Sequence, residues 1–482
     1  MKLTSLSLVF SHLFYILPAT GCLTDYEQQH LDGHPAHRPS LHRRQFIGNG
    51  TNFTESSIPI GVGDRFKSGT IAPRGIGLLS NITLGGGPGN IIVITPGPGT
   101  NTTVPSTPFP TLYNVGELNS GTRALAREFG LEYFEMPYKT HDNATMYGFK
   151  VPGAHSHGKS GAGYTVLLEA GIHARERGGP DHLLNFIADL LWARREKKGL
   201  TYGGSVYTVE EVKTALEAGI VVVPLVNPDG VAYDQATGSC WRKNRNRASA
   251  SAGDPTSIGV DINRNFPAAW DFRKSLAPGV PVSASTAPFS EAFVGTAPLS
   301  EPEAKNIDWT MAQMPEMKWF LDIHSMAGVL LYGWGHDSNQ VADKNMNILN
   351  AKYDGKRGQF PDTPQFRYGE YYPQKGLDEA MIATAYMAQA MSGVVGNPWT
   401  AQASVNLYPT SGVSTSHPMY RSIAGPGPAK KQVAHGLTLE FSNGGPTTGS
   451  CPFYPSVGTH QRNMAEVGAA TMALLLNAAR LK

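Results

Sequence analysis

An apolar run that ends in reactive side chains is the first feature of the sequence. The stretch from Leu167 to Leu184 reads LLEAGIHARERGGPDHLL and places His173, Arg175 and Glu176 directly after residues typical of a buried strand. Unpaired polar groups there are costly, so these side chains need partners. His173 and Glu176 are three residues apart and can point at one spot in a turn or helical start. An imidazole and a carboxylate so placed provide two ligands of a zinc site.

A second apolar run offers a third ligand. In FLDIHSM, strand alternation puts Asp322 and His324 on one face and Leu321 and Ile323 on the other. His324 at the end of this buried strand is a suitable third corner for zinc. An HxxE pair alone is a weak signal, because such spacing arises by chance and more often forms a pair on a helix surface.

The elements that must position these residues alternate between strands and helices from about Tyr113 onward. Buried strands are expected within 163–173, 219–230, 317–326 and 434–445, and helices within 180–195 and 461–480. This order predicts an α/β fold, with a mixed, mainly parallel twisted sheet covered by helices on both faces in a single catalytic domain. In such sheets, chemistry gathers where strands end in loops.

The first 108 residues have a different composition. Residues 1–21 combine Lys2 with an apolar run and small residues, which predicts a secretory signal peptide, with a retained signal anchor as the alternative. Residues 22–108 are rich in Gly, Pro, Thr and Ser and predict a glycosylated pro-region or linker, in which 90–95 adds one short strand. The Arg43 and Arg44 pair is a candidate processing site, although a lone basic pair is more often simply solvated. The catalytic domain is expected over 109–482.

Several features predict a secreted, extracellular protein. Glycosylation acceptors occur at Asn49, Asn52, Asn81, Asn101 and Asn143. Of the three cysteines, Cys22 lies beside the signal peptide, so Cys240 and Cys451 are expected to form one disulfide. The net charge of +2 without a dense basic run argues against nucleic acid. No later run is long and apolar enough for a bilayer, so we expect a soluble protein, without a membrane partner and monomeric.

Six short motifs occur in a characteristic order: HARE, NPDG, WRKNRN, DINRN, DIHS and LTLEF. This series resembles the zinc metallocarboxypeptidases of the carboxypeptidase A/B type, from about Tyr113 to the C-terminus. The resemblance implies one zinc ion per chain, held by His173, Glu176 and His324. It further implies that Asp261 accepts the N–H of the first histidine and that Glu440 is the general base.

The same resemblance implies a set of substrate contacts. Asn263 and Arg264 match the pair that binds the terminal carboxylate, for which a guanidinium is the geometric partner. Arg242 matches the residue that polarises the scissile carbonyl. Arg175 matches an auxiliary contact, and Tyr408 the mobile tyrosine that closes over substrate.

Terminal-residue preference is expected to depend on Thr415, which falls at the position that reads the last side chain. Asp there would favour a basic residue, so Thr415 predicts neutral or apolar termini. Thr438 shares a strand face with Glu440 and is expected in the same cleft. Met326 stands where the family often has Tyr, and the stretch from Tyr408 to Glu440 is longer than the family pattern.

The sequence therefore predicts a zinc-dependent carboxypeptidase that hydrolyses the C-terminal peptide bond of peptides or proteins. One alternative is a secreted, non-catalytic binding protein on the same fold, because fold does not fix function. The carboxylate of Glu440 argues against it. The other alternative is a peptidase that cuts cell-wall peptides, which Asn263 and Arg264 disfavour modestly.

Overall fold

The structure is a computed structural model that describes residues 57–68, 71–78, 109–154, 163–361, 367–425, 433–442 and 451–481. It also gives the backbone of two paired strands, β1 (Ile82–Thr83) and β2 (Val93–Ile94). The short strand predicted within 90–95 is therefore confirmed. The expected signal peptide, the Arg43 and Arg44 pair, and the acceptors Asn49, Asn52, Asn81 and Asn101 lie outside the described residues.

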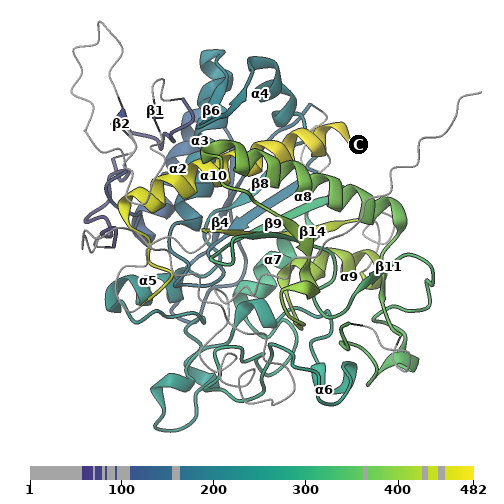
Figure 1. Cartoon of the computed structure of the whole chain (residues 1–482). Coiled ribbons are helices and arrows are strands. Elements are labelled where there is room, and N and C mark those ends of the chain that lie inside the picture. The colour runs from purple at the N-terminus through teal and green to yellow at the C-terminus, as the bar shows by residue number, and fades with distance from the viewer. Residues whose placement is uncertain are drawn as a thin grey trace, which may run out of the picture.

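An eight-stranded mixed sheet forms the centre of the catalytic domain (Figure 1). Its four central strands are parallel and almost wholly buried: β8 (Ile220–Val223), β5 (Val166–Ala170), β9 (Trp319–Ser325) and β14 (His435–Phe441). Strands extend it at both edges: β4 (Tyr147–Val151) and β3 (Glu132–Glu135) beyond β8, and β10 (Val329–Tyr332) and β13 (Ala401–Ala403) beyond β14. Burial on both faces explains why the central strands read as apolar runs. The predicted mainly parallel sheet is confirmed.

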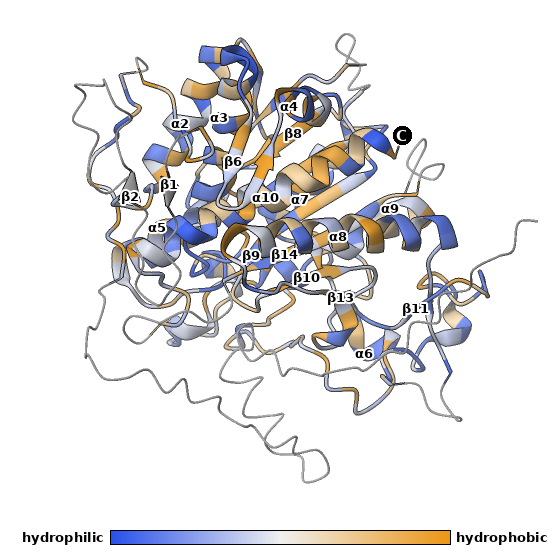
Figure 2. Ribbon diagram, turned by 45° about the horizontal axis from the view of Figure 1, so that its top comes forward, coloured by the Kyte–Doolittle hydropathy of each residue, from blue (hydrophilic) through white to orange (hydrophobic). Residues whose placement is uncertain are grey.

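Helices cover one face of this sheet and form the larger core. They are α2 (Val115–Phe129), α3 (Gly179–Glu196), α4 (Val209–Leu216), α8 (Gln374–Val395) and α10 (Val457–Arg480). Helix α10 packs between α3 and α8 and is buried along most of its length. Figure 2 shows apolar residues gathered in the strands and in the helices beside them. Leu168 and Leu321 point into this core.

The opposite face carries α7 (Pro302–Ala312), α9 (His417–Ala424) and long loops. Leu167 and Phe320 pack there against Ile307 of α7, in a second apolar cluster. The described residues also include smaller strands and helices: β6 (Leu200–Tyr202), β7 (Ser205–Tyr207), α5 (Pro228–Thr237), α6 (Phe272–Ser275), β11 (Asn339–Gln340) and β12 (Glu370–Tyr371). Because side chains alternate along a strand, the residues on this loop-rich face are the ones available for a site.

Residues 57–68 and 71–78, which we call the N-terminal strap, pack on the α2 and α3 side of the domain. The side chains of Ile58, Phe66 and Ile76 are buried. The N–H of Gly77 donates to Oδ2 of Asp189 on α3 at 2.8 Å. Part of the stretch expected to be pro-region or linker is therefore packed against the catalytic domain. Isolated apolar residues in a Gly-rich and Pro-rich stretch show no period that could indicate this packing.

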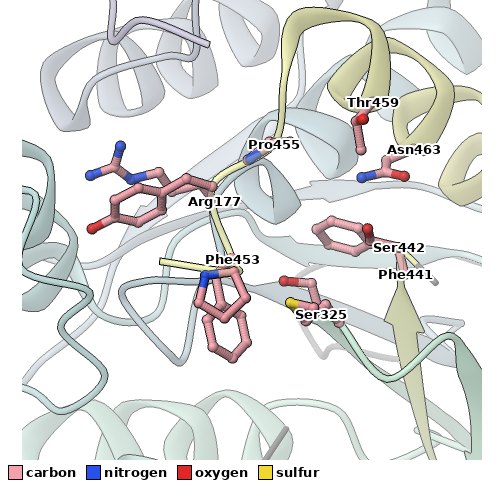
Figure 3. A pocket seen from close by; sticks show the side chains of 11 residues that line it. Arg177, Ser325, Phe441, Ser442, Phe453, Pro455, Thr459 and Asn463 are labelled. Carbon is pink, nitrogen blue, oxygen red and sulfur yellow. The ribbon is translucent and has the colours of Figure 1, made fainter. Parts of the chain in front are cut away.

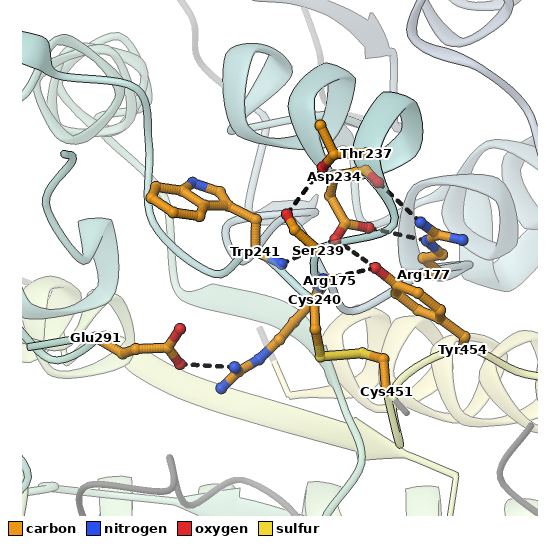
Figure 4. Close-up of a disulfide and its surroundings, with 10 residues drawn as sticks. All are labelled: Arg175, Arg177, Asp234, Thr237, Ser239, Cys240, Trp241, Glu291, Cys451 and Tyr454. Atoms are coloured by element: carbon orange, nitrogen blue, oxygen red, sulfur yellow. Dashed lines mark hydrogen bonds and ion pairs between the residues drawn. A yellow bond between two sulfur atoms is a disulfide. The ribbon is translucent and has the colours of Figure 1, made fainter. Parts of the chain in front are cut away.

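The predicted disulfide between Cys240 and Cys451 is confirmed, with Cα atoms 5.6 Å apart (Figure 4). Next to it, the Tyr454 hydroxyl accepts from the N–H of Cys240 at 2.9 Å and donates to Asp234 Oδ1 at 2.6 Å. Arg177 also donates to Asp234. The bridge therefore joins the loop before Arg242 to the segment that follows β14.

We expect the double variant Cys240→Ala/Cys451→Ala to unfold more easily than the unmodified protein. The bridge joins residues 211 positions apart, and removing a cross-link of this kind typically costs about 2–5 kcal/mol of unfolding free energy. Thermal and urea unfolding of the variant measure this loss, with Cys22→Ala as the matched control. An unfolding free energy equal to that of the control would contradict a stabilising bridge.

Candidate active site

The three predicted metal ligands converge where β5 and β9 end. His173 and Glu176 follow β5, and His324 lies at the end of β9. The turn after β5 depends on Gly171, whose φ of 72° suits glycine and whose added Cβ would lie 2.8 Å from Pro180. This turn brings His173 back over the sheet.

One carboxylate lies between the two imidazoles. Glu176 Oε1 lies 2.7 Å from His173 Nδ1, and its Oε2 lies 3.0 Å from His324 Nδ1. The two Nδ1 atoms are 3.1 Å apart, and one ligand atom from each residue lies within 4.8 Å of the others. All three side chains are buried. Two neutral imidazoles and one carboxylate fit a catalytic zinc site, which takes three protein ligands and keeps a fourth position open.

Each of the two histidines contacts a carboxylate through its other ring nitrogen, Nε2. Asp261 Oδ1 lies 3.2 Å from His173 Nε2, as the resemblance implied, and Asp322 Oδ2 lies 2.9 Å from His324 Nε2. Such partners fix the tautomer and the orientation of the ring, so that Nδ1 faces the metal position. The role of Asp322 was missed at the sequence level, although a buried acid on the face of His324 was a usable signal.

Arg242 is held by the same carboxylate that supports His173. Its Nε and Nη2 donate to Asp261 Oδ2 at 3.0 and 2.9 Å. Burial alone would raise the pKa of Asp261, but the charges of Arg242 and His173 outweigh it and lower this pKa. The contacts of Asp261 therefore favour its anionic form, which accepts hydrogen bonds from both Arg242 and His173.

A cleft of about 490 Å³ contains most of the predicted site. Its wall includes the three metal ligands and seven further predicted residues: Arg242, Asn263, Arg264, Tyr408, Thr415, Thr438 and Glu440. Other lining residues were not predicted, among them Leu331 on β10 and, from the segment after β13, Ser404, Leu407, Thr410 and Val413. They belong to no short motif, so the sequence offered no signal for them.

Strand β14 places Glu440 beside the metal position. In the parallel register of β9 and β14, Glu440 lies opposite His324, and Thr438 lies opposite Asp322. Both β14 residues face the cleft, as strand alternation predicted. The N–H of Ala327 donates to Glu440 Oε2 at 3.3 Å. A carboxylate is thereby held next to the three metal ligands.

Asn263 and Arg264 lie in a 3₁₀ turn that Asp261 caps. The N–H of Asn263 donates to Asp261 Oδ1 at 3.0 Å. The guanidinium of Arg264 donates from Nη2 to the hydroxyl of Ser283 and from Nη1 to the carbonyl of Asn263, each at 2.8 Å. These bonds hold the side chain along the cleft wall, where it can receive a planar anion.

Arg175 is the one predicted substrate contact that does not line the cleft. Its Nη1 donates to Oε2 of Glu291 at 2.6 Å, and its guanidinium lies 4.5 Å from the ring centre of Phe453. Figure 4 shows Arg175 pointing toward Glu291, next to the disulfide. A substrate contact by Arg175 stays a prediction.

A second pocket of about 300 Å³ adjoins the site (Figure 3). Its lining includes Ser325 and Met326, which follow His324, and Phe441 and Ser442, which follow Glu440. Phe453 closes one side. Met326, in the place of the family's frequent Tyr, therefore gives this wall a thioether instead of a hydroxyl.

Among the residues that the structure describes, no helix combines the length and the apolar content needed to cross a bilayer.

Comparisons with known proteins agree with this geometry. The zinc carboxypeptidase family model matches residues 137–421, more than half of the chain. Human carboxypeptidase O is 26% identical over 259 residues, which are 50% of this chain and 61% of the relative. Bovine carboxypeptidase B is 32% identical over 195 residues, 40% of each chain. The chain thus covers less than two thirds of either relative.

The fold also resembles that of bovine thrombin-activatable fibrinolysis inhibitor, with a TM-score of 0.53 and 18% identity over 77% of this chain and 99% of that chain. This likeness concerns the fold alone. The family model spans the metal ligands, Asp261, Arg242 and the Asn263 and Arg264 pair. The chain therefore belongs to the zinc carboxypeptidase family.

Proposed function

We propose that the protein is a secreted zinc-dependent carboxypeptidase that removes the C-terminal residue of peptides or proteins. One observation carries the proposal. A single cleft brings together the metal ligands, the carboxylate of Glu440 and the Asn263 and Arg264 pair. A non-catalytic binding protein would need neither the carboxylate nor its position beside the ligands.

Each side chain of the cleft is assigned one role in peptide-bond hydrolysis. A bound zinc ion would supply Lewis-acid chemistry and lower the pKa of water. Glu440 accepts the proton of the attacking water and delivers it to the leaving amine. Arg242 donates hydrogen bonds to the carbonyl oxygen as negative charge develops there. Asn263 and Arg264 hold the terminal carboxylate, and this fixes which peptide bond reaches Glu440.

The composition of the cleft supports a preference for neutral or apolar terminal residues. Apart from the residues assigned above to the metal, the base, the scissile carbonyl and the terminal carboxylate, every described side chain that lines it is uncharged. Leu331, Leu407 and Val413 supply apolar surface, and Thr415 and Thr438 supply small hydroxyl groups. A basic terminal side chain would find no carboxylate partner there, and burying it unpaired is costly.

Secretion has support from two further features. The bond between Cys240 and Cys451 is typical of an oxidising compartment. Asn143, one of the predicted glycosylation sites, is exposed in a turn, where a glycan can be accommodated. A signal peptide over 1–21, a pro-region or linker over 22–108 and the monomeric state are proposed from the sequence alone.

Mass spectrometry of a peptide mixture tests the proposed function. We expect loss of single C-terminal residues, fastest for neutral and apolar ones, and no loss after treatment with a zinc chelator. Added zinc should restore the activity, because the site is built from protein side chains alone. Internal cleavage would favour another peptidase class, and a lack of any cleavage by zinc-loaded protein would favour the binding-protein alternative.

A further inference from the structure

Two buried acids lie side by side beneath the metal site. Glu169 on β5 is directly opposite Asp322 on the neighbouring parallel strand β9. Both are completely buried. Glu169 lies on the strand face that carries Leu167, and Asp322 on the face that carries His324. The pair therefore lies on the side of the sheet that bears the cleft.

Three oxygens of this pair lack a hydrogen-bond partner among the described residues. They are Oε1 and Oε2 of Glu169 and Oδ1 of Asp322. Two neighbouring carboxylates without cations are strongly unfavourable inside a protein. Burial, followed by the charge of Asp322, raises the pKa of Glu169 well above its usual range. Glu169 thus has a proton to donate, and Oδ1 of Asp322 is the acceptor beside it.

The other carboxylate oxygen of Asp322, Oδ2, already contacts two polar groups. Its Oδ2 lies 2.9 Å from His324 Nε2 and accepts from the hydroxyl of Ser414 at 2.6 Å. The N–H of Ser414 donates to Oδ1 of Asn263 at 2.7 Å. The amide Nδ2 of Asn263 lies 3.3 Å from His324 Nε2. Asp322 therefore supports a metal ligand and, through Ser414, a residue of the carboxylate-binding wall.

Packing alone does not require an acid at position 169. Leu167 lies two residues earlier on the same strand face, and its apolar side chain packs in the second core cluster. An apolar residue in place of a buried polar one is often neutral or stabilising. The unpaired Oδ1 of Asp322 explains the acid at 169, because a protonated carboxyl group there supplies the donor that this oxygen otherwise lacks.

We propose that Glu169 is a positioning residue, which as a neutral acid donates a hydrogen bond to Oδ1 of Asp322 and so fixes the carboxylate that holds His324 and Ser414. The contribution to catalysis rests on the proposed function, whereas the effect on the geometry of the metal site does not.

Two variants of similar size separate the hydrogen bond from the packing. Glu169→Gln keeps an N–H donor and the neutral charge, so we expect kcat and the metal site to remain close to normal. Glu169→Met keeps the length and removes the donor. We expect it to lower kcat at least tenfold with little change in KM, because Asp322 then holds His324 less firmly.

Cobalt-substituted protein gives a readout that does not depend on turnover. The visible absorption bands of bound Co²⁺ report ligand geometry, and we expect them to shift in Glu169→Met and not in Glu169→Gln. Leu167→Met is the matched control, since it changes a buried residue on the same strand face without a polar contact. It should leave both the spectrum and kcat unchanged.

Each outcome decides the proposal. A spectrum and kcat for Glu169→Met equal to those of Leu167→Met would overturn it, as would equal damage in Glu169→Gln and Glu169→Met. If Glu169→Met does not fold, Glu169→Leu, which also lacks a donor, replaces it in the comparison with Glu169→Gln. If the unmutated protein cleaves no peptide, the proposed function fails, while the cobalt spectra still test the role of Glu169.

Discussion

Glu440→Gln should reduce peptide hydrolysis by about 10²–10⁴-fold while zinc stays bound, since general acid–base catalysis typically contributes that much. Glutamine keeps the size of the side chain and can still accept the N–H of Ala327. It cannot take a proton from water at neutral pH. Because the ligands His173, Glu176 and His324 are unchanged, zinc content should equal that of the unmutated protein. Steady-state kinetics and elemental analysis of the same preparation measure both quantities.

Glu210→Gln is a suitable control for this experiment, because Glu210 is exposed on α4, on the sheet face opposite the cleft, and its ion pair is with Lys213 of the same helix. It should leave turnover unchanged. Near-normal turnover in Glu440→Gln would show that another group accepts the proton. Loss of zinc together with activity would contradict the role given to Glu440, since it would make this residue a support of the metal site.

Blocking the substrate's terminal carboxylate as an amide should slow cleavage on the order of 10²–10³-fold. The amide removes the charge that Arg264 and Asn263 bind, and a buried charge without its partner commonly costs about 3–5 kcal/mol. Part of this energy positions the scissile bond, so kcat should fall as well as affinity. Rates on matched free-acid and amidated peptides measure the effect.

Arg264→Ala should remove most of the difference between acid and amide, because the group that discriminates between them is gone. Arg264→Lys should give an intermediate result, since it keeps the charge and loses the two-pronged geometry. Equal rates on acid and amide in the unmutated protein would rule out an exopeptidase that reads the terminal carboxylate.

The framework of the fold was predictable because the central strands are buried on both faces. The runs around Val166, Ile220, Trp319 and His435 are short, apolar and bounded by turn residues, and each proved to be a strand of the sheet. The ends of parallel strands meet at one edge, so the strand pattern was enough to expect His173 and His324 in one place, and the family resemblance added Glu440.

The rest of the site depends on contacts between distant parts of the chain. Glu291 lies 116 residues after Arg175, in a loop without a regular pattern, so its ion pair had no sequence signal. Leu407 and Val413 reach the cleft from loops around the segment that is longer than the family pattern. The pairing of Glu169 with Asp322 depends on which strands are neighbours and in what register, which local sequence does not determine.

The N-terminal strap sets a boundary for maturation. A protease that cuts after Arg44 leaves the strap joined to the rest of the chain. A cut anywhere within 79–108 breaks that covalent link and leaves the contacts of Ile58, Phe66 and Ile76 in place. We expect the product of such a cut to be a two-chain protein, in which a short peptide remains bound to the catalytic domain as a subunit.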